Sequence, residues 1–364
     1  MKILIVIPSL RKGGAENVAA SLSRELAKNH DVYLGLFEAT KESIQYPYGG
    51  NLVDIACPAT KSYLRKCANF FIRVGRLFTL LKEKEFDRII ALLTSANFPT
   101  LLAARIAGYS HCTIVSERVT PEAKPVMVQW AMGFFYRWAA STVLNAQAGC
   151  DYFVTKLKLP KNKVTTIPNP IDFALVKQKF QQHVEPLWKG AEPVVVACGR
   201  LVLQKGFDVL LKAFAEVLEQ RPAKLVIFGE GPMRRELSEM IHRLGIDDHV
   251  LMPGITDNIY ANFDHSDVFV LSSRFEGSPN VLLEAMAVGM PVVATNCKTG
   301  PTEILSDGKF GVLVPTENSH AIAQAILKVL DHPDVHKSLR ESVLNRASEF
   351  DVRHIAKRWL NPNP

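Results

Sequence analysis

Short apolar segments of strand length alternate with helical patterns along almost the whole chain, and this alternation limits the folds that the chain can adopt. The first segment, residues 3–7, is continuously apolar, which is typical of a strand buried on both faces of a parallel sheet. The alternation continues through the first half and restarts at residue 194. Strands that alternate with helices indicate βαβ units. We therefore expect an α/β protein built from two doubly wound, Rossmann-like domains.

A pair of prolines marks the end of the first domain. Pro168 and Pro170 exclude a helix in this segment and favour an extended connection. The last stretch of the chain has a helical pattern and is expected to pack back on the first domain. Two domains joined in this way leave a cleft, where ligands commonly bind. The expected first domain, linker, second domain and C-terminal helix are residues 1–170, 171–190, 191–341 and 342–364.

The composition favours a globular cytoplasmic protein. Hydrophobic residues make up 48% of the chain and charged residues 22%. The 6 cysteines are scattered without a Cys-x-x-Cys pair, which argues against a zinc site or a disulfide framework and fits a reducing compartment. No apolar window is long enough, without charges, to span a bilayer.

The positive charge is concentrated in the first half. Residues 1–180 hold 24 Lys and Arg against 13 Asp and Glu, a net charge of +11, whereas residues 181–364 hold 19 against 23, a net charge of −4. A basic half beside a mildly acidic half indicates that the first half meets an anionic surface. Lipid headgroups, a diphosphate-linked substrate or nucleic acid would each provide one.

Two carboxylates follow the apolar segment at residues 268–271. Glu276 falls in a Gly- and Pro-containing loop after this strand, and Glu284 falls one to two turns inside the next helix. Ligands bind at the carboxyl edge of an open parallel sheet, and ionised carboxylates there can accept hydrogen bonds from a hydroxyl-rich ligand. The alternative is that the acids only suit the dipole of the helix N-terminus.

Two cations follow the first strand of the second half. Arg200 and Lys205 share one strand-to-helix loop, at the sheet edge expected for Glu276. A guanidinium and an ammonium together would neutralise a diphosphate, although such residues are also commonly just solvated. No Asp-x-Asp motif is present, so we expect these two cations to carry this role without a metal ion.

The chain resembles the retaining glycosyltransferases of family 4, which have the GT-B fold of two Rossmann-like domains with parallel sheets facing across a cleft. The resemblance runs nearly from end to end and depends on the joint order of its motifs. These motifs are Gly13-Gly14-Ala15-Glu16, Gly199-Arg200 with Lys205-Gly206, Glu276 and Glu284 with seven residues between them, Gly289-x-Pro291 and Gly300-Pro301-x-Glu303.

The resemblance implies a role for each motif. Arg200 and Lys205 would bind the diphosphate of the sugar donor, Glu276 the sugar hydroxyls and Glu284 the ribose hydroxyls. The Gly13-Gly14 loop would lie against the phosphates and the reacting centre, so that Gly14 and Glu276 count among the catalytic positions. Further contacts to the sugar donor are expected at Gly254, Gly277, Ser278, Val281 and Leu282.

One position departs from the family pattern. Many members carry a histidine near the donor sugar after a strand of the first domain, whereas this chain has Ser116-Glu117-Arg118. This form resembles a subgroup that builds bacterial surface polysaccharides and lipid-linked oligosaccharides. Glu117 or Arg118 is therefore the candidate for the role at the reaction centre. The alternative is that the two side chains form a local ion pair.

A basic, amphipathic helix is expected at residues 61–84. Aromatic and aliphatic residues recur there at three- and four-residue steps, and the segment contains a single acid, Glu83. Such a helix can lie on a membrane surface, hold the diphosphate of an acceptor, or simply pack with its cations in solvent. Nucleic acid is disfavoured because no binding motif accompanies the charge. The candidate acceptor or membrane residues are Lys61, Arg65, Lys66, Arg73 and Arg76.

Together these features predict a retaining glycosyltransferase at the inner face of the cell membrane. It would move a hexose or N-acetylhexosamine from a nucleotide diphosphate sugar, with UDP as the nucleotide, to a polyprenyl-diphosphate-linked or other glycan. One alternative is a UDP-sugar epimerase of the same fold, and another is a nucleotide-sugar-binding protein without catalysis. The choice of sugar depends on one or two hydrogen bonds that a sequence does not reveal.

Overall fold

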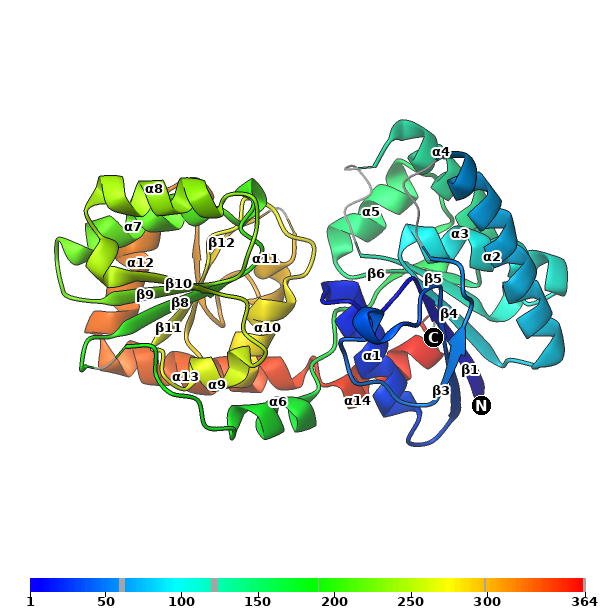
Figure 1. Cartoon of the computed structure of the whole chain (residues 1–364), viewed down its shortest axis with the longest axis horizontal. Coiled ribbons are helices and arrows are strands. Elements are labelled where there is room, and N and C mark those ends of the chain that lie inside the picture. Colours follow the sequence, from blue (N-terminus) through cyan, green and yellow to red (C-terminus); the bar gives the residue numbers. More distant parts are fainter. Residues whose placement is uncertain (59–62, 119–123, 189, 298, 363–364) are drawn as a thin grey trace. The chain divides into compact units, whose positions relative to one another are not determined.

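The chain forms two compact units in a computed structural model that describes residues 1–58, 63–118, 124–188, 190–297 and 299–362. The first unit consists of residues 1–170 together with 352–364, and the second consists of residues 171–351. Each unit is a parallel sheet with helices on both faces (Figure 1). The expected pair of doubly wound, Rossmann-like domains is therefore confirmed.

The first unit contains a sheet of 7 strands in the order β3-β2-β1-β4-β5-β6-β7, and each neighbouring pair is parallel. Its central strand β1 is apolar throughout because helices cover both of its faces: Leu4 and Val6 pack in one core cluster, and Ile3, Ile5 and Ile7 in the other. The strands are β1 Lys2–Ile7, β2 Asp31–Leu36, β3 Asn51–Asp54, β4 Arg88–Leu92, β5 Thr113–Glu117, β6 Ser141–Leu144 and β7 Val164–Thr166.

The helices of the first unit form two layers. One core cluster lies under α2, α3, α4 and α5, and the other under α1 and α14. The side chain of Trp359, from α14, is fully buried in the second cluster beside residues of α1. The helices are α1 Gly14–Leu26, α2 Tyr63–Glu83, α3 Thr94–Ala107, α4 Val126–Phe135, α5 Gln147–Thr155 and α14 Val352–Leu360, with short 3-10 turns at Lys41–Ser43, Ser110–Cys112, Tyr136–Trp138 and Lys161–Lys163.

The second unit contains a parallel sheet of 6 strands in the order β10-β9-β8-β11-β12-β13. Its central strand β8 sends Val195 and Ala197 into one core cluster and Val196 into the other. The strands are β8 Val194–Cys198, β9 Lys224–Phe228, β10 Val250–Gly254, β11 Val268–Leu271, β12 Val292–Thr295 and β13 Val312–Val314.

Helices cover both faces of the second sheet as well. Figure 1 shows α7, α8 and α12 on one face, and α9, α10 and α13 on the other. The helices are α6 Phe173–Phe180, α7 Phe207–Leu218, α8 Arg234–Leu244, α9 Ile259–Phe263, α10 Asn280–Ala287, α11 Pro301–Ile304, α12 Ser319–Asp331 and α13 Pro333–Ser348, with 3-10 turns at Leu203–Lys205 and Asp247–His249.

Two local expectations need correction. The segment before Pro168 is not only a connection, because residues 164–166 form β7 and pair with β6. The continuous helix expected from residue 342 to residue 360 is broken between α13 and α14. At this break Ile171 pairs with Asp351 in an isolated bridge, and the Ile171 amide donates to the carbonyl of Phe350 at 2.8 Å. Satisfying that amide requires an extended residue where a helix would continue.

Within the described ranges, no helix is both long enough and apolar enough to cross a bilayer.

Candidate active site

Two loops of the second unit are joined at the carboxyl edge of its sheet. The loop after β8 carries Arg200 and Lys205, and the loop after β11 carries Glu276; β8 and β11 are hydrogen-bonded neighbours. The Arg274 amide donates to the Gln204 carbonyl at 2.8 Å, and the Gln204 side chain donates to the carbonyl of Phe275 at 2.9 Å. These bonds fix the two loops against each other.

A glycine makes this close approach possible. Gly206 has a φ of +63° in the left-handed region, and a Cβ atom at this position would collide with the carbonyl oxygen of Ser272. The Ser272 hydroxyl donates to the carbonyl of Lys205 at 2.9 Å across the same contact. The Lys205-Gly206 pair of the motif therefore brings the end of one loop against the start of the other.

Lys205 and Glu276 form an ion pair at this edge. The Lys205 Nζ lies 2.5 Å from Glu276 Oε1, and both side chains are largely buried. The Ser273 hydroxyl donates to the same carboxylate oxygen at 2.7 Å, and the Thr299 hydroxyl donates to the Glu276 carbonyl. The pair compensates two charges that would otherwise be costly to bury.

Glu284 lies on α10. Its carboxyl group is buried, although the residue as a whole keeps some exposure. Burial raises the pKa of Glu284 to about 7, against the opposing effects of a hydrogen bond from Tyr260 and the charge of Lys179. Burial, and next the charge of Glu284, raise the pKa of Cys198 to about 12, which places Glu284 near the carboxyl end of β8.

The remaining residues expected at the sugar donor lie around these loops. Arg200 is exposed, and Gly277 approaches Gly300 so closely that a Cβ atom on Gly300 would lie 2.6 Å from the Gly277 carbonyl oxygen. Gly254 ends β10 and accepts a hydrogen bond from the Gly229 amide at 2.8 Å. Ser278 and Val281 are partly buried in the loop before α10 and in its first turn.

Leu282 is an exception among these residues. Its side chain is fully buried in the core, and its amide donates to the carbonyl of Pro279 at 3.2 Å. The hydrophobic spacing of α10 accounts for this position, so Leu282 supports the helix that carries Glu284.

In the first unit, the Gly13-Gly14 loop follows β1. The Lys12 amide donates to the Gln45 side chain at 2.8 Å, and the Gly13 amide donates to the Tyr46 hydroxyl at 3.3 Å. Gly13 has an extended backbone, and Gly14 is the first residue of α1. The loop is thus held in place at the carboxyl edge of the first sheet, the edge at which β5 ends with Glu117.

Glu117 is buried at the centre of a polar cluster. Its Oε1 accepts hydrogen bonds from the Asn97 amide at 2.9 Å and from the Tyr136 hydroxyl, and its Oε2 accepts one from the Thr94 hydroxyl at 2.9 Å. Lys124 Nζ lies 3.6 Å from Oε2. Burial raises the pKa of Glu117, although the Lys124 charge and the three hydrogen bonds oppose it. The carboxyl group is therefore committed to partners within the first unit.

Arg118 points to different partners. One guanidinium nitrogen donates to Asn169 at 2.8 Å, and the guanidinium lies 5.1 Å from the centre of the Trp359 ring. Among the described residues, its Nε and Nη2 atoms are buried without a hydrogen-bond partner, and burial lowers its pKa. The alternative of a local ion pair between Glu117 and Arg118 is wrong, because Glu117 pairs with Lys124 and Arg118 donates to Asn169.

The basic helix expected from the sequence corresponds to α2. Two of its candidate residues, Arg73 and Arg76, donate hydrogen bonds within the first unit. Arg73 donates to the carbonyl of Cys57 at 2.8 and 3.1 Å, and Arg76 donates to the carbonyl of Ala56 at 2.7 Å. These bonds favour the interpretation of a packed helix. Arg65 is exposed, Lys66 lies on α2, and Lys61 is outside the described residues.

Sequence reasoning missed the residues that hold these groups. Ser273 is the second residue after β11 and could have been suspected from that position. The partners contributed by other helices carry no signal in the sequence, because only the fold brings them close. The missed partners are Tyr260 and Lys179 for Glu284, Thr299 for Glu276, and Thr94, Asn97, Lys124 and Tyr136 for Glu117.

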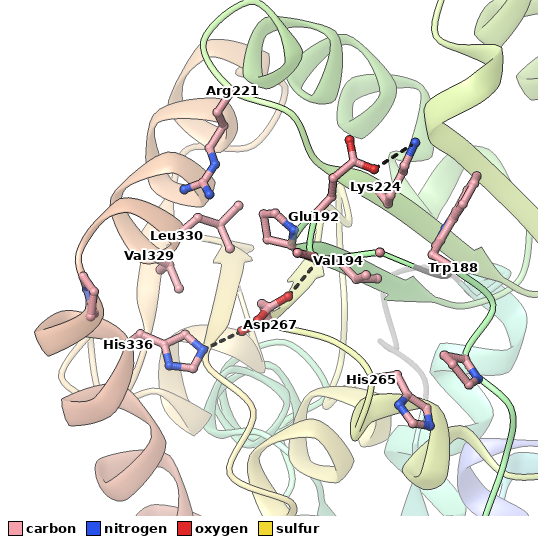
Figure 2. A pocket seen from close by; sticks show the side chains of 15 residues that line it. Trp188, Glu192, Val194, Arg221, Lys224, His265, Asp267, Val329, Leu330 and His336 are labelled. Atoms are coloured by element: carbon pink, nitrogen blue, oxygen red, sulfur yellow. Dashed lines mark hydrogen bonds and ion pairs between the residues drawn. The ribbon is translucent and has the colours of Figure 1, made fainter.

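A hollow of about 700 Å³ lies elsewhere on the second unit (Figure 2). It is lined by the first residues of β8 and β9, by Asp267 just before β11, and by the end of α12. Its cations are paired, since Lys224 lies 3.2 Å from Glu192 and Arg221 pairs with Asp331. The hollow is at the amino edge of the sheet, opposite Glu276, and is therefore separate from the expected sugar-donor site.

Among the described residues, no group of three or more His, Cys, Asp or Glu side chains is arranged to hold a metal ion. Independence from metal remains a prediction.

Comparisons with known proteins agree with this geometry. A model described as Glycosyltransferase Family 4 matches residues 12–175, and one described as Glycosyl transferases group 1 matches residues 178–346. The chain is 30% identical over 333 residues to an uncharacterised glycosyltransferase of Methanocaldococcus jannaschii, covering 79% of this chain and 81% of the relative.

A Campylobacter jejuni relative is 27% identical over 372 residues, covering 99% of this chain and 98% of the relative. It is named N-acetylgalactosamine-N,N'-diacetylbacillosaminyl-diphospho-undecaprenol 4-alpha-N-acetylgalactosaminyltransferase.

Two solved structures share the fold. A glycosyltransferase from Rickettsia africae superposes with a TM-score of 0.80 at 17% identity, covering 98% of this chain and 96% of the other. Anabaena HepE, in complex with UDP and glucose, also has a TM-score of 0.80, at 22% identity and 98% coverage of both chains. The motifs, the two parallel sheets and these matches agree, and the chain therefore belongs to the glycosyltransferases of family 4 and has their GT-B fold.

Proposed function

We propose that this glycosyltransferase moves a hexose or N-acetylhexosamine from a UDP-linked sugar to a polyprenyl-diphosphate-linked glycan, with retention of the anomeric configuration. The observation that carries the proposal is the Lys205–Glu276 ion pair beside the exposed Arg200, at the carboxyl edge of the second sheet. The name of the Campylobacter relative supports a lipid-linked acceptor, and the HepE complex supports UDP.

Lys205 and Glu276 suit a diphosphate sugar because the ligand offers a different binding partner to each of them. The diphosphate would attract the Lys205 ammonium together with the Arg200 guanidinium, which can fork onto phosphate oxygens. Glu276 would then be free to accept hydrogen bonds from the sugar hydroxyls. Glu284, one helix turn further along, would accept hydrogen bonds from the ribose.

Retention in this proposal needs no protein nucleophile. Glu117 is a poor candidate for that role because its carboxylate is buried and already accepts three hydrogen bonds. We favour displacement on one face of the sugar, in which the leaving diphosphate takes the proton of the acceptor hydroxyl. Arg118 has two nitrogen atoms without a partner among the described residues, so it is the better candidate for stabilising charge near the reaction.

The proposal also places the enzyme at the cytoplasmic face of the membrane, where a polyprenyl-linked acceptor would be held. It assigns no metal ion to the reaction, since Arg200 and Lys205 can carry the charge of the leaving diphosphate.

The proposal is tested in two steps. A thermal-shift panel of nucleotide sugars should show a higher midpoint with UDP-sugars than with GDP-sugars, because a ligand that binds only the folded state stabilises it. The stabilising UDP-sugar is then incubated with polyprenyl-diphosphate-linked acceptors, with and without EDTA. Product formation that is insensitive to EDTA, with an unchanged anomeric configuration by NMR, is the expected result.

Other outcomes would favour other functions. Conversion of the UDP-sugar to its epimer without an acceptor would favour an epimerase. Binding without turnover, for every acceptor tried, would favour a nucleotide-sugar-binding protein. A product with inverted configuration would exclude the retaining mechanism.

A further inference from the structure

The helix α4 exposes an unusual amount of apolar surface. Val126, Met127, Trp130 and Phe134 are 69%, 85%, 79% and 61% exposed. Their spacing places them along one side of the helix, because residues four apart lie one above the other. Single exposed apolar residues are ordinary, whereas four large ones on one helix face mark an interaction surface. We call these four residues the outer face of α4.

The opposite side of α4 already packs against the rest of the first unit. Met132 is fully buried, and the Phe135 ring meets the Phe98 ring edge-on with 5.7 Å between centres. A Cβ atom on Gly133 would lie 3.1 Å from the carbonyl oxygen of Leu157, so this side fits closely against the segment after α5. Apart from Gln129 the residues of this helix are apolar, and among the described residues its packing within the unit involves mainly this side.

The part of the chain that carries α4 is basic. The segment 124–163 contains six Lys and Arg residues and a single acid, Asp151. Arg137 follows α4 and donates to the carbonyls of Gly133 at 3.0 Å and Lys158 at 2.9 Å, which fixes its charge beside the helix. Lys156 and Lys158 are exposed on the segment against which α4 packs. An apolar strip with Trp and Phe, followed by Arg137 and carried on a basic segment, complements the interface of an anionic bilayer.

The length of α4 limits how it can meet a membrane. A helix of 10 residues extends about 15 Å, roughly half the thickness of a bilayer's hydrocarbon core. Its inner side is also fixed in the first unit. Only the outer face can enter the lipid, with the helix lying along the surface.

We propose that the outer face of α4 is the membrane-docking surface of this protein. Met127, Trp130 and Phe134 would enter the headgroup region, while Arg137, Lys156 and Lys158 would face lipid phosphates. The partner is an anionic bilayer. Membrane docking would bring the enzyme to a lipid-linked acceptor, and only this purpose rests on the proposed function.

The proposal moves the membrane contact away from α2. The guanidinium groups of Arg73 and Arg76 donate to carbonyls of the segment 55–57. They hold that segment in place, whereas Val126, Met127 and Trp130 of the α4 outer face are each more than two thirds exposed.

The test is co-sedimentation of the full chain with vesicles of phosphatidylcholine, with and without phosphatidylglycerol. Wild type should sediment with the anionic vesicles, and the Met127→Ser/Trp130→Ser double variant should bind at least about tenfold more weakly, since two large apolar side chains are lost from the interface. Lys156→Glu/Lys158→Glu should bind anionic vesicles much more weakly, and its remaining binding should depend less on salt. The matched control is Phe71→Ser, which removes a 68%-exposed aromatic residue from α2 and should bind like wild type.

Trp130 supplies a direct readout. Its fluorescence should shift to the blue and be quenched by brominated lipids, and this quenching should be smaller in Trp130→Phe. Equal sedimentation of wild type and the double variant would overturn the proposal, as would loss of binding in Phe71→Ser instead. If the double variant abolishes self-association in sedimentation velocity while vesicle binding persists, the outer face binds a second copy and the proposal is wrong.

Activity separates this proposal from the proposed function. On a short-chain, water-soluble acceptor the double variant should be as active as wild type. No transfer by either protein would count against the proposed function alone, because vesicle binding is measured without any sugar.

Discussion

Lys205 Nζ lies 2.5 Å from Glu276 Oε1, and the two residues come from loops that follow neighbouring strands of one parallel sheet. Each is expected to bind a different part of the sugar donor, the diphosphate for Lys205 and the sugar for Glu276. The ion pair neutralises both charges. Under this assignment a diphosphate sugar contacts both partners, whereas UDP contacts Lys205 alone.

This relationship predicts different effects for the two substitutions. Lys205→Met should weaken both UDP and the UDP-sugar by about 10- to 100-fold, since a hydrogen bond to a charged group contributes about 1.5–3 kcal/mol. Glu276→Gln should weaken the UDP-sugar by a similar factor but leave UDP unchanged or slightly tighter, because the competitor for Lys205 is removed. Isothermal titration with both ligands measures this difference. Equal losses for UDP and UDP-sugar in Glu276→Gln would contradict the assignment of Glu276 to the sugar.

The sequence predicted most of this edge because the residues sit in ordered motifs. Strand patterns located β8 and β11, and the parallel topology then required Arg200, Lys205 and Glu276 to lie at one edge. It could not predict that Tyr260 donates a hydrogen bond to Glu284, because that contact depends on how α9 packs against α10. The partners of Glu117 and the carbonyls bound by Arg76 could not be predicted for the same reason. These contacts join segments about 20 residues apart in the sequence.

Arg76 is expected to support the first unit rather than bind an acceptor. It donates to the carbonyls of Ala56, at 2.7 Å, and Ile55. Arg76→Ala should lower the free energy of unfolding of this unit by about 0.5–1.5 kcal/mol, because the hydrogen bonds to those carbonyls are lost. Arg65→Ala, at an exposed position of the same helix, should change it by less than about 0.5 kcal/mol.

Hydrogen exchange is the appropriate measurement, since it resolves the two units. Amides near residues 55–57 should exchange faster in Arg76→Ala than in Arg65→Ala. An Arg76→Ala protein with unchanged exchange but weaker transfer to a diphosphate-linked acceptor would instead support the acceptor role.

Glu117 and Arg118 are expected to separate into a stability role and an activity role. Tyr136→Phe removes one of the hydrogen bonds to the buried Glu117 carboxylate and should cost about 1.5–3 kcal/mol of stability. The control Tyr152→Phe removes a hydroxyl that donates to a neutral amide at 2.5 Å and should cost about 0.5–1.5 kcal/mol. Both free energies of unfolding are measured by urea titration, with hydrogen exchange of amides in the first unit as the readout.

Arg118→Ala should lower kcat by about 100-fold or more while the protein remains folded, since a preorganised charge near the reaction is lost. Glu117→Gln, assayed below its unfolding temperature, should keep kcat within about tenfold of wild type. The reverse pattern would place Glu117 at the reaction centre and leave Arg118 as a support for α14.

The raised pKa of Glu284 makes both stability and ligand binding depend on pH. Folding raises this pKa from an ordinary value of 4.5 to about 7. Between these values the folded protein holds a proton that the unfolded chain has lost, so this group makes the protein less stable as pH rises through the window. The full difference corresponds to about 3 kcal/mol. The difference in free energy of unfolding between Glu284→Gln and wild type should therefore shift in favour of the variant as pH rises from 4.5 to 7. Above pH 7 this difference should stay constant.

Binding of the sugar donor should have the opposite dependence. If the ionised carboxylate of Glu284 accepts the ribose hydroxyls, the affinity for a UDP-sugar should rise about ninefold from pH 6 to pH 8, as the ionised fraction rises from about one tenth to about nine tenths. The experiment uses a UDP-sugar and not UDP, because the terminal phosphate of UDP would itself titrate near pH 6. Glu284→Gln should bind more weakly and show no such rise. A wild-type affinity that is constant across this range would mean that Glu284 does not hold the ribose as a carboxylate, because only that role links donor binding to its ionisation.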